Sequence, residues 1–294
     1  MMREGFAAFI LTHGRPDRVV TYETMRKAGY TGRIFLVIDD EDKAGDEYRK
    51  RYGEQVLTFN KHESLAIVDD GINDNDFRSP LYARNVCFEL AKEQGCKYFV
   101  QLDDDYPRFD YRFHADLSPA PENVRVKSMD EVLEHLIEFY DGSGASSVAI
   151  SQGGDWLGGA GGCPTPRIRR KVMNFFIFSV DSVFRFMAKM NDDVTSYVVN
   201  DRTGLLCFTV MQVSLHQGRT QQNAGGLTEM YLENGTYVKS FYSVMYAPSC
   251  VKIGVMGDPT TDQYRLHHAI DWTRTAPLIL REGHRKAPRT GGLE

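Results

Sequence analysis

The alternation of apolar runs with amphipathic segments in the first hundred residues constrains the fold more than any other feature of this sequence. Phe6–Thr12 (FAAFILT) and Arg33–Ile38 (RIFLVI) are continuous apolar runs, typical of parallel strands that are buried on both faces. Between them, Asp17–Ala28 has the spacing of a helix that is capped by Asp17 and ends at Gly29. A short charged helix and a third strand are expected at Asp46–Tyr52 and Gln55–Phe59. This order is typical of a doubly wound α/β sheet.

The next helix and strand lead to a run of three acidic residues. Pro80–Gln94 is amphipathic with a helical period, and Lys97–Leu102 is an apolar strand followed by Asp103, Asp104 and Asp105. Ligands of open α/β sheets bind at the carboxyl ends of the strands. Alternate carboxylates in such a turn point the same way, so Asp103 and Asp105 could bind one hard cation, Mn²⁺ or Mg²⁺. The alternative is a solvated acidic turn in which an aspartate caps a helix.

The rest of the chain continues the mixed pattern without a repeat or a linker. We therefore expect one α/β domain over residues 1–294, a Rossmann-like mixed sheet with helices on both faces. Its donor half is expected at about residues 1–110 and its acceptor and catalytic half at about 111–294. The expected elements beyond the aspartates are a helix at Asp130–Tyr140 and strands at Ser147–Ser151, Val172–Val180, Leu205–Val213, Tyr237–Met245 and Cys250–Ile253.

Composition excludes several classes of protein. No apolar run approaches the roughly 18 residues that a membrane helix needs, and the apolar start is too short for a secretory signal. We therefore expect a cytoplasmic protein that does not bind membranes. The net charge of −5 provides no general attraction to nucleic acid. The five cysteines are odd in number and form no C-x-x-C pair, which favours buried reduced thiols over disulfides or zinc. They are Cys87, Cys96, Cys163, Cys207 and Cys250.

An ordered set of short phrases resembles a known family. THGRPD, VIDDED, ARN and QLDDDY, each in the context described above, resemble the donor half of a glycosyltransferase-A fold with its D-x-D metal motif. With NDDV, TQQNAGG and GTYVKSFYSVMYAPS, the set is similar to the TET-associated glycosyltransferases of bacteriophages, over Phe6 to roughly Lys286. That family glycosylates 5-hydroxymethylpyrimidines in DNA. The resemblance implies a UDP-sugar donor, a DNA acceptor that contains 5-hydroxymethylcytosine, a divalent metal and no obligate protein partner.

The resemblance also assigns roles around the donor. It implies that the diphosphate is bound through a metal held by Asp103 and Asp105, and that Arg84 and Asn85 lie over the donor and support the turn. Asp39 would meet the base or the ribose. The remaining residues implied in donor binding are Thr12, His13, Gly14, Arg15 and Asp104. For His13 the alternative is an ordinary turn residue, and for Arg84 it is a surface charge on a helix.

The catalytic base is expected in the phrase Asn191-Asp192-Asp193-Val194. Related enzymes carry an acidic pair at the corresponding place, and an inverting transfer needs a base that takes the proton of the acceptor hydroxyl. We expect Asp193 to be this base, with Asp192 as the other candidate; the alternative is a helix N-cap. His267 is expected as a third metal ligand by the same resemblance, and the alternative is a structural histidine.

Acceptor binding is expected at two features. The glycine-rich segment GGDWLGGAGG is typical of a closing lid in which Trp156 covers a sugar or a base, although a loop without such a role fits equally well. A positive cluster follows it, and a second lies in the tail at Arg281, Arg285, Lys286 and Arg289; either could bind phosphates or be a solvated charge run. The first cluster consists of Arg167, Arg169, Arg170 and Lys171.

Other functions stay open at this point. The same chemistry could act on a glycan or a small metabolite, which the negative net charge favours. A nucleotidyltransferase shares the sheet and the carboxylates, but THGRPD is short of the glycines that its first loop needs. A non-catalytic binding module would leave the acidic turns without a purpose.

Overall fold

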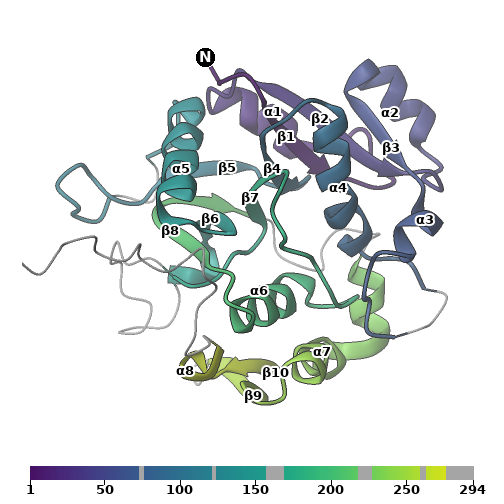
Figure 1. The fold of residues 1–294 in the computed structure, drawn as a ribbon, viewed down its shortest axis with the longest axis vertical. Coiled ribbons are helices and arrows are strands. Elements are labelled where there is room, and N and C mark those ends of the chain that lie inside the picture. The colour runs from purple at the N-terminus through teal and green to yellow at the C-terminus, as the bar shows by residue number, and fades with distance from the viewer. Residues whose placement is uncertain (73–75, 121–123, 157–168, 218–226, 259–262, 276–294) are drawn as a thin grey trace, which may run out of the picture.

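The computed structural model describes residues 1–72, 76–120, 124–156, 169–217, 227–258 and 263–275. Its centre is an eight-stranded sheet in the order β3-β2-β1-β4-β7-β6-β8-β5 (Figure 1). The strands are β1 Phe6–Leu11, β2 Arg33–Asp39, β3 Val56–Phe59, β4 Tyr98–Asp103, β5 Arg108–Tyr111, β6 Ser147–Gln152, β7 Phe175–Ser179 and β8 Cys207–His216.

The first half of the sheet is parallel. β1 pairs with β2 on one side and with β4 on the other, with Leu11 opposite Val37 and Asp103. Every residue of β1 is buried, which explains its unbroken apolar sequence. Because parallel strands end at the same edge of a sheet, the segments after β1, β2 and β4 meet there.

The second half changes direction. β7 runs antiparallel to β4 and β6, β6 is parallel to β8, and β5 closes the far edge against β8. β7 begins only at Phe175, later than the predicted strand, because Asn174 has a left-handed backbone with φ 60°. The reversal places the start of β7 beside the carboxyl end of β4.

Helices cover both faces, as the sequence predicted. Side chains of β1 alternate between two cores: Phe6, Ala8 and Ile10 face one, and Ala7, Phe9 and Leu11 face the other. The first core contains residues of α1, α2 and α5, and the second contains residues of α4 and α6. The helices are α1 Val20–Lys27, α2 Gly45–Tyr52, α3 Lys61–Leu65, α4 Leu81–Glu93, α5 Met129–Ser143 and α6 Asp192–Arg202, with 3₁₀ turns at Gly53–Gln55 and Gly153–Trp156.

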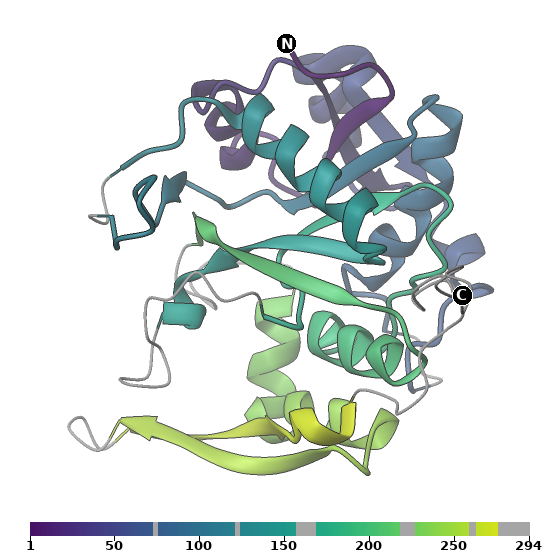
Figure 2. The same cartoon turned by 60° about the vertical axis from the view of Figure 1, so that its left-hand side comes forward.

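A smaller C-terminal unit packs against α6 at the end of the molecule opposite α1 and α2 (Figure 2). It consists of α7 Leu227–Tyr246, the antiparallel pair β9 Val251–Asp258 and β10 Gln263–Ile270, and the short α8 Trp272–Thr275. The strand predicted at Tyr237–Met245 was wrong, because this segment lies in α7. Its β-type residues misled the prediction: Tyr237, Phe241 and Met245 are four residues apart and form an exposed helical stripe.

Smaller differences concern ends and thiols. α1 begins at Val20 without a side-chain cap, so the predicted Asp17 cap was wrong. Four cysteines are free and buried, as predicted, and Cys163 lies outside the described residues. None of the helices in the described part is long and apolar enough to span a bilayer.

Candidate active site

The three aspartates lie where the chain turns out of β4, and each has different partners. Asp104 points inward and is 1% exposed. Its carboxylate accepts two hydrogen bonds from Arg15, at 2.7 Å from Nε and 2.8 Å from Nη2, and one from the hydroxyl of Thr12 at 2.6 Å. The Thr12 hydroxyl also lies 2.7 Å from that of Tyr48. The structure therefore places Thr12, Arg15 and Asp104 together in a contact that fixes the turn to the end of β1.

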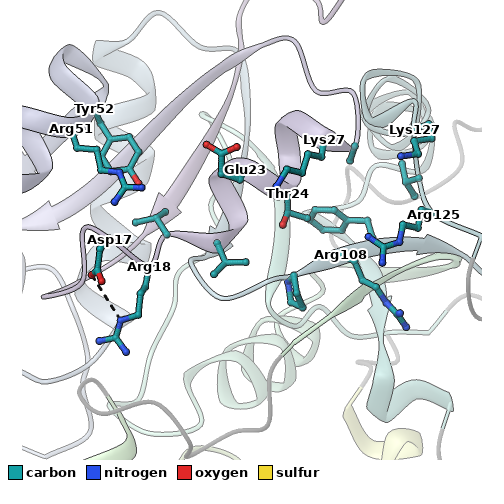
Figure 3. A pocket seen from close by; sticks show the side chains of 16 residues that line it. Asp17, Arg18, Glu23, Thr24, Lys27, Arg51, Tyr52, Arg108, Arg125 and Lys127 are labelled. Carbon is teal, nitrogen blue, oxygen red and sulfur yellow. Dashed lines mark ion pairs between the residues drawn. The ribbon is translucent and has the colours of Figure 1, made fainter.

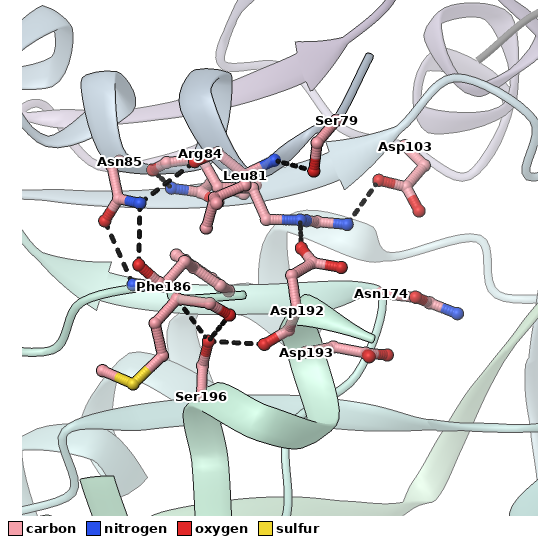
Figure 4. Close-up of polar contacts among 12 residues, drawn as sticks. Ser79, Leu81, Arg84, Asn85, Asp103, Asn174, Phe186, Asp192, Asp193 and Ser196 are labelled. Atoms are coloured by element: carbon pink, nitrogen blue, oxygen red, sulfur yellow. Dashed lines mark hydrogen bonds and ion pairs between the residues drawn. The ribbon is translucent and has the colours of Figure 1, made fainter. Parts of the chain in front are cut away.

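Asp103 faces α4, where a buried arginine joins it to a distant acid. Arg84 is 3% exposed; its Nη2 donates to Asp103 at 3.0 Å and its Nε to Asp192 at 2.9 Å (Figure 4). The guanidinium lies over the rings of Phe176 and Phe186, at 4.8 Å and 5.5 Å from their centroids. This position rules out the surface-charge alternative for Arg84. One guanidinium thus connects the turn after β4 with the start of α6.

Replacing Arg84 with Met is expected to destabilise the fold by about 3–5 kcal/mol, because it leaves the buried Asp192 and the partly buried Asp103 without their cation. The thioether would fill similar space, so the loss would come from charge rather than from a cavity. Urea unfolding of both proteins measures it. Arg185→Met is a suitable comparison, since Arg185 also lies over an aromatic ring but is not buried and forms no ion pair within the described residues. Equal unfolding free energies for the wild type and Arg84→Met would contradict this role.

Among the three aspartates, Asp105 has a carboxylate oxygen that lacks a hydrogen-bond partner in the described residues. Its Oδ1 is buried and forms no hydrogen bond with the described residues. Burial, and then the charges of Asp103 and Asp104, raise the pKa of Asp105 to about 7 against the opposing effect of Arg15. An orphaned carboxylate oxygen beside a second carboxylate suits a hard divalent cation, whose charge would offset the repulsion. The residues present therefore fit Mn²⁺ or Mg²⁺.

A second acidic turn follows β2. Asp39 accepts a hydrogen bond from His13 at 2.8 Å and lies 3.4 Å from the ammonium of Lys61. The hydrogen bond to Asp39 raises the pKa of His13; burial opposes ionisation of Asp39, but His13 and Lys61 together lower its pKa. The amide of Gly14 donates to Asp42 at 2.8 Å. These residues adjoin a cleft of about 570 Å³, lined by both His13 and Gly14.

Asn85 lies next to Arg84 but is used within the protein. Its amide nitrogen donates to the carbonyl oxygens of Leu81 and Phe186, and its oxygen accepts from the amide of Phe186 at 3.0 Å. It ties α4 to the segment before α6. Asn85 therefore helps to fix the part of α4 that carries Arg84.

The two acids at the start of α6 differ in direction. Asp192 is buried and points to Arg84, whereas Asp193 is half-buried and points to the side on which Asn174 lies (Figure 4). Burial, opposed by Arg84 and reinforced by Asp193 and Asp103, raises the pKa of Asp192. Asn191 precedes the pair with φ 58° and its side chain donates to Ser243 at 2.6 Å. Neither acid forms a side-chain cap, and Asp193 accepts only from the adjacent amide of Val194 in the described part of the chain.

His267 lies on β10, and its neighbour makes the contact with α6. His268 Nδ1 is 3.2 Å from the amide nitrogen of Asn191. Burial lowers the pKa of His268 to about 3 and also lowers that of His267. Within the described ranges no group of three or more histidine, cysteine, aspartate or glutamate residues is arranged to hold a metal, so His267 is not gathered with the two aspartates.

The predicted acceptor residues lie partly outside the described residues. Arg167 and the tail cluster are outside them, as is the side chain of Trp156. Lys171 forms an ion pair with Asp155, and Arg170 donates to the carbonyl oxygen of Trp272 and to Thr275. Arg169 pairs through its backbone with Thr209.

Sequence reasoning missed a group of amides beside the aspartates. The side chain of Asn174 donates to Gln152 at 2.8 Å and to Gln217 at 2.9 Å, which joins the carboxyl ends of β6 and β8. A hydrogen bond from Gln217 lowers the pKa of Asp105, and the hydroxyl of Tyr106 donates to the carbonyl oxygen of Asn174. No motif marks these residues, because their three segments meet only through the antiparallel strand.

Comparison with solved structures finds matches at low sequence identity and low structural similarity. S. aureus TarS 1-349 in complex with UDP-GlcNAc is 12% identical with a TM-score of 0.40, over 74% of this chain and 59% of that one. The mannosyltransferase PcManGT from Pyrobaculum calidifontis, in complex with GDP-Man and Mn²⁺, is 10% identical with a TM-score of 0.44, over 85% of this chain and 75% of that one. GalNAc-T7 with UDP, GalNAc and Mn²⁺ is 11% identical with a TM-score of 0.42, over 72% of this chain and 43% of that one. The chain thus spans about three-fifths of the length of TarS 1-349. No curated protein sequence matches it.

The strand order defines a mixed α/β fold, with helices on both faces of the sheet and an acidic turn after β4. The family model of the TET-associated glycosyltransferases matches residues 6–226, which is more than half of the chain. The protein belongs to that family.

Proposed function

We propose that this protein transfers a sugar from a UDP-sugar to the hydroxymethyl group of a 5-hydroxymethylpyrimidine in DNA, 5-hydroxymethylcytosine in the first place, with inversion at the anomeric carbon. The observation that carries the proposal is the link through Arg84, which joins the turn of Asp103 to the acids of α6. A site that moves a sugar needs donor and base groups held together, and this contact supports both at one edge of the sheet.

On the donor side, the segments that follow β1, β2 and β4 each have a separate role in binding the nucleotide-sugar. The cleft beside His13 and Gly14 receives the nucleotide, and Asp39 is in place to accept from a base or ribose. Asp103 and Asp105 would hold Mn²⁺ or Mg²⁺, which when bound supplies positive charge against the diphosphate. Arg15 and Thr12 keep Asp104 buried and so orient its two neighbours.

On the acceptor side, Asp193 acts as the general base. It takes the proton of the hydroxymethyl group while that oxygen forms the new bond to the anomeric carbon and the bond to the UDP oxygen breaks. Asp192 is committed to Arg84, so it positions α6 rather than receiving the proton. The target pyrimidine must leave the base stack to reach these groups.

Incubation with Mn²⁺, a panel of UDP-sugars and DNA containing 5-hydroxymethylcytosine or 5-hydroxymethyluracil tests the proposal. We expect nucleoside mass spectrometry to find a hexosylated nucleoside, and its anomeric configuration by NMR to be opposite to that of the donor. Sugar transfer only to glycans or free metabolites would overturn the assignment of DNA as the acceptor. The net charge of −5 favours that alternative, because it disfavours binding of a polyanion.

A further inference from the structure

A basic cavity lies along α1, apart from the donor cleft. It has a volume of about 390 Å³ and is lined by six basic side chains and two carboxylates (Figure 3). This is a local excess of positive charge on a chain whose net charge is −5. The basic residues come from the start and end of α1, the end of α2, the start of β5 and the segment before α5: Arg18, Lys27, Arg51, Arg108, Arg125 and Lys127.

Most of these cations are not neutralised within the protein. Arg108 pairs with the buried Asp110 at 3.1 Å, and Arg51 donates one hydrogen bond to the carbonyl oxygen of Pro16 at 3.1 Å but has no carboxylate partner in the described residues. The side chains of Lys27, Arg125 and Lys127 are exposed and form no hydrogen bond or ion pair with any residue in the described ranges. Arg18 lies 3.9 Å from Asp17, at the outer limit of an ion pair, and is 57% exposed. Exposed charges without partners remain available to an external anion.

By contrast, the cluster that the sequence favoured is partly occupied. Lys171 pairs with Asp155, and Arg170 is bound to the backbone of Trp272 and approaches Asp201 at 3.9 Å. An anion at either side chain would have to displace these contacts. The cavity along α1 therefore offers more available positive charge than the described part of that cluster.

These cations lie at the two ends of α1, and the start of this helix adjoins the aspartate turn (Figure 3). Thr21 donates from its hydroxyl to the carbonyl oxygen of Asp103 at 2.6 Å, so the start of α1 adjoins the site. At the other end Gly29, with φ +87°, approaches the carbonyl of Lys127 so closely that a Cβ there would collide with it. This approach places Lys127 beside Lys27. From Val20 to Lys27 the helix rises by about 10 Å.

We propose that these cations at the two ends of α1, the α1 basic surface (Arg18, Lys27, Arg51, Arg125 and Lys127), bind the sugar–phosphate backbone of the DNA acceptor; the inference rests on the proposed function. One DNA strand presents a phosphate about every 3.4 Å along the axis, so a rise of about 10 Å matches about three phosphates. Exposed lysines and arginines without an amide or aromatic reader bind phosphates irrespective of sequence. The α1 basic surface thus contributes affinity for DNA of any sequence, and the candidate active site selects the modified base.

The test compares two double variants with equal charge change: Lys27→Glu/Lys127→Glu on the surface, and Lys92→Glu/Lys252→Glu as the control. Lys92 and Lys252 are exposed residues of α4 and β9. Fluorescence anisotropy with an unmodified duplex over a range of NaCl gives the log–log slope of affinity. We expect the surface variant to lose about two units of slope, about one for each phosphate contact, and the control to keep the wild-type slope. Equal slopes for the two variants would overturn the proposal.

A second measurement separates this inference from the proposed function. With free 5-hydroxymethyl-2′-deoxycytidine, which has no phosphates, the surface variant should transfer sugar as fast as the wild type, while its KM for modified DNA rises. Equal loss with both acceptors would assign the effect to folding or to the donor site and would count against the surface. Failure of the wild type to glycosylate any modified DNA would overturn the proposed function, whereas the slopes on unmodified duplex still decide the surface.

Discussion

Asp105→Ala is expected to abolish glycosyl transfer while the protein stays folded. The carboxylate has a buried oxygen without a partner in the described residues and a pKa raised to about 7, so its removal relieves repulsion at the expense of one hydrogen bond from Gln217. A loss of about 4 kcal/mol in stabilisation of the departing diphosphate corresponds to about 10³-fold in rate. The measurement is transfer at saturating donor and Mn²⁺, with thermal unfolding of both proteins.

Two comparisons make this result specific. Asp181→Ala removes an exposed aspartate after β7 and should leave the rate unchanged. Chelation of divalent cations by EDTA should reproduce the loss in the wild type, and added Mn²⁺ should restore it. Full activity in excess EDTA would falsify the role of the metal, and an active Asp105→Ala protein would remove this residue from the ligands.

Asp193→Asn is expected to lower kcat by about 10²–10⁴-fold with little change in donor affinity. The amide keeps the size of the side chain and can still accept from Val194, but it cannot take a proton from the acceptor. Single-turnover rates and calorimetric titration with UDP separate the two quantities. A parallel loss of UDP affinity would show that Asp193 belongs to the donor site instead.

Asp192→Asn is the informative partner of that variant. It leaves Arg84 with one carboxylate instead of two, so we expect reduced stability together with reduced rate, because α6 is held less firmly. The ratio of the two losses distinguishes positioning from proton transfer. A fully stable, inactive Asp192→Asn protein beside an active Asp193→Asn protein would move the base by one residue.

The N-terminal half of the fold was predictable from sequence because its central strands are buried on both faces. Runs such as Phe6–Thr12 are apolar without interruption, and the helices between them carry a clear period. The C-terminal unit was less accessible. Aromatic and β-branched residues of α7 indicate a strand by composition, and only packing against β9 and β10 selects the helix.

The candidate site was predictable where its residues are adjacent in sequence. The acidic turn after β4 was found in this way, and so was the acidic pair of α6. The sequence did not predict that Arg15 would bind Asp104 or that Arg84 would reach Asp192 as well as Asp103. Arg15 and Asp104 are 89 residues apart, and Arg84 and Asp192 are 108 residues apart. The amide of Asn174 was missed because it reaches the site only through the reversal of β7.

The guanidinium that Asp103 and Asp192 share limits how chimeras of this protein can be constructed. Asp103 lies in the N-terminal half of the chain and Asp192 in the C-terminal half, yet both are bound by the same side chain of α4. A C-terminal half transplanted from a relative will dock correctly only if it has an acid at the position of Asp192. A transplanted N-terminal half must have an arginine at the position of Arg84. The boundary for exchanging halves therefore cannot be chosen from strand positions alone, because the three residues contact one another and have to be exchanged together.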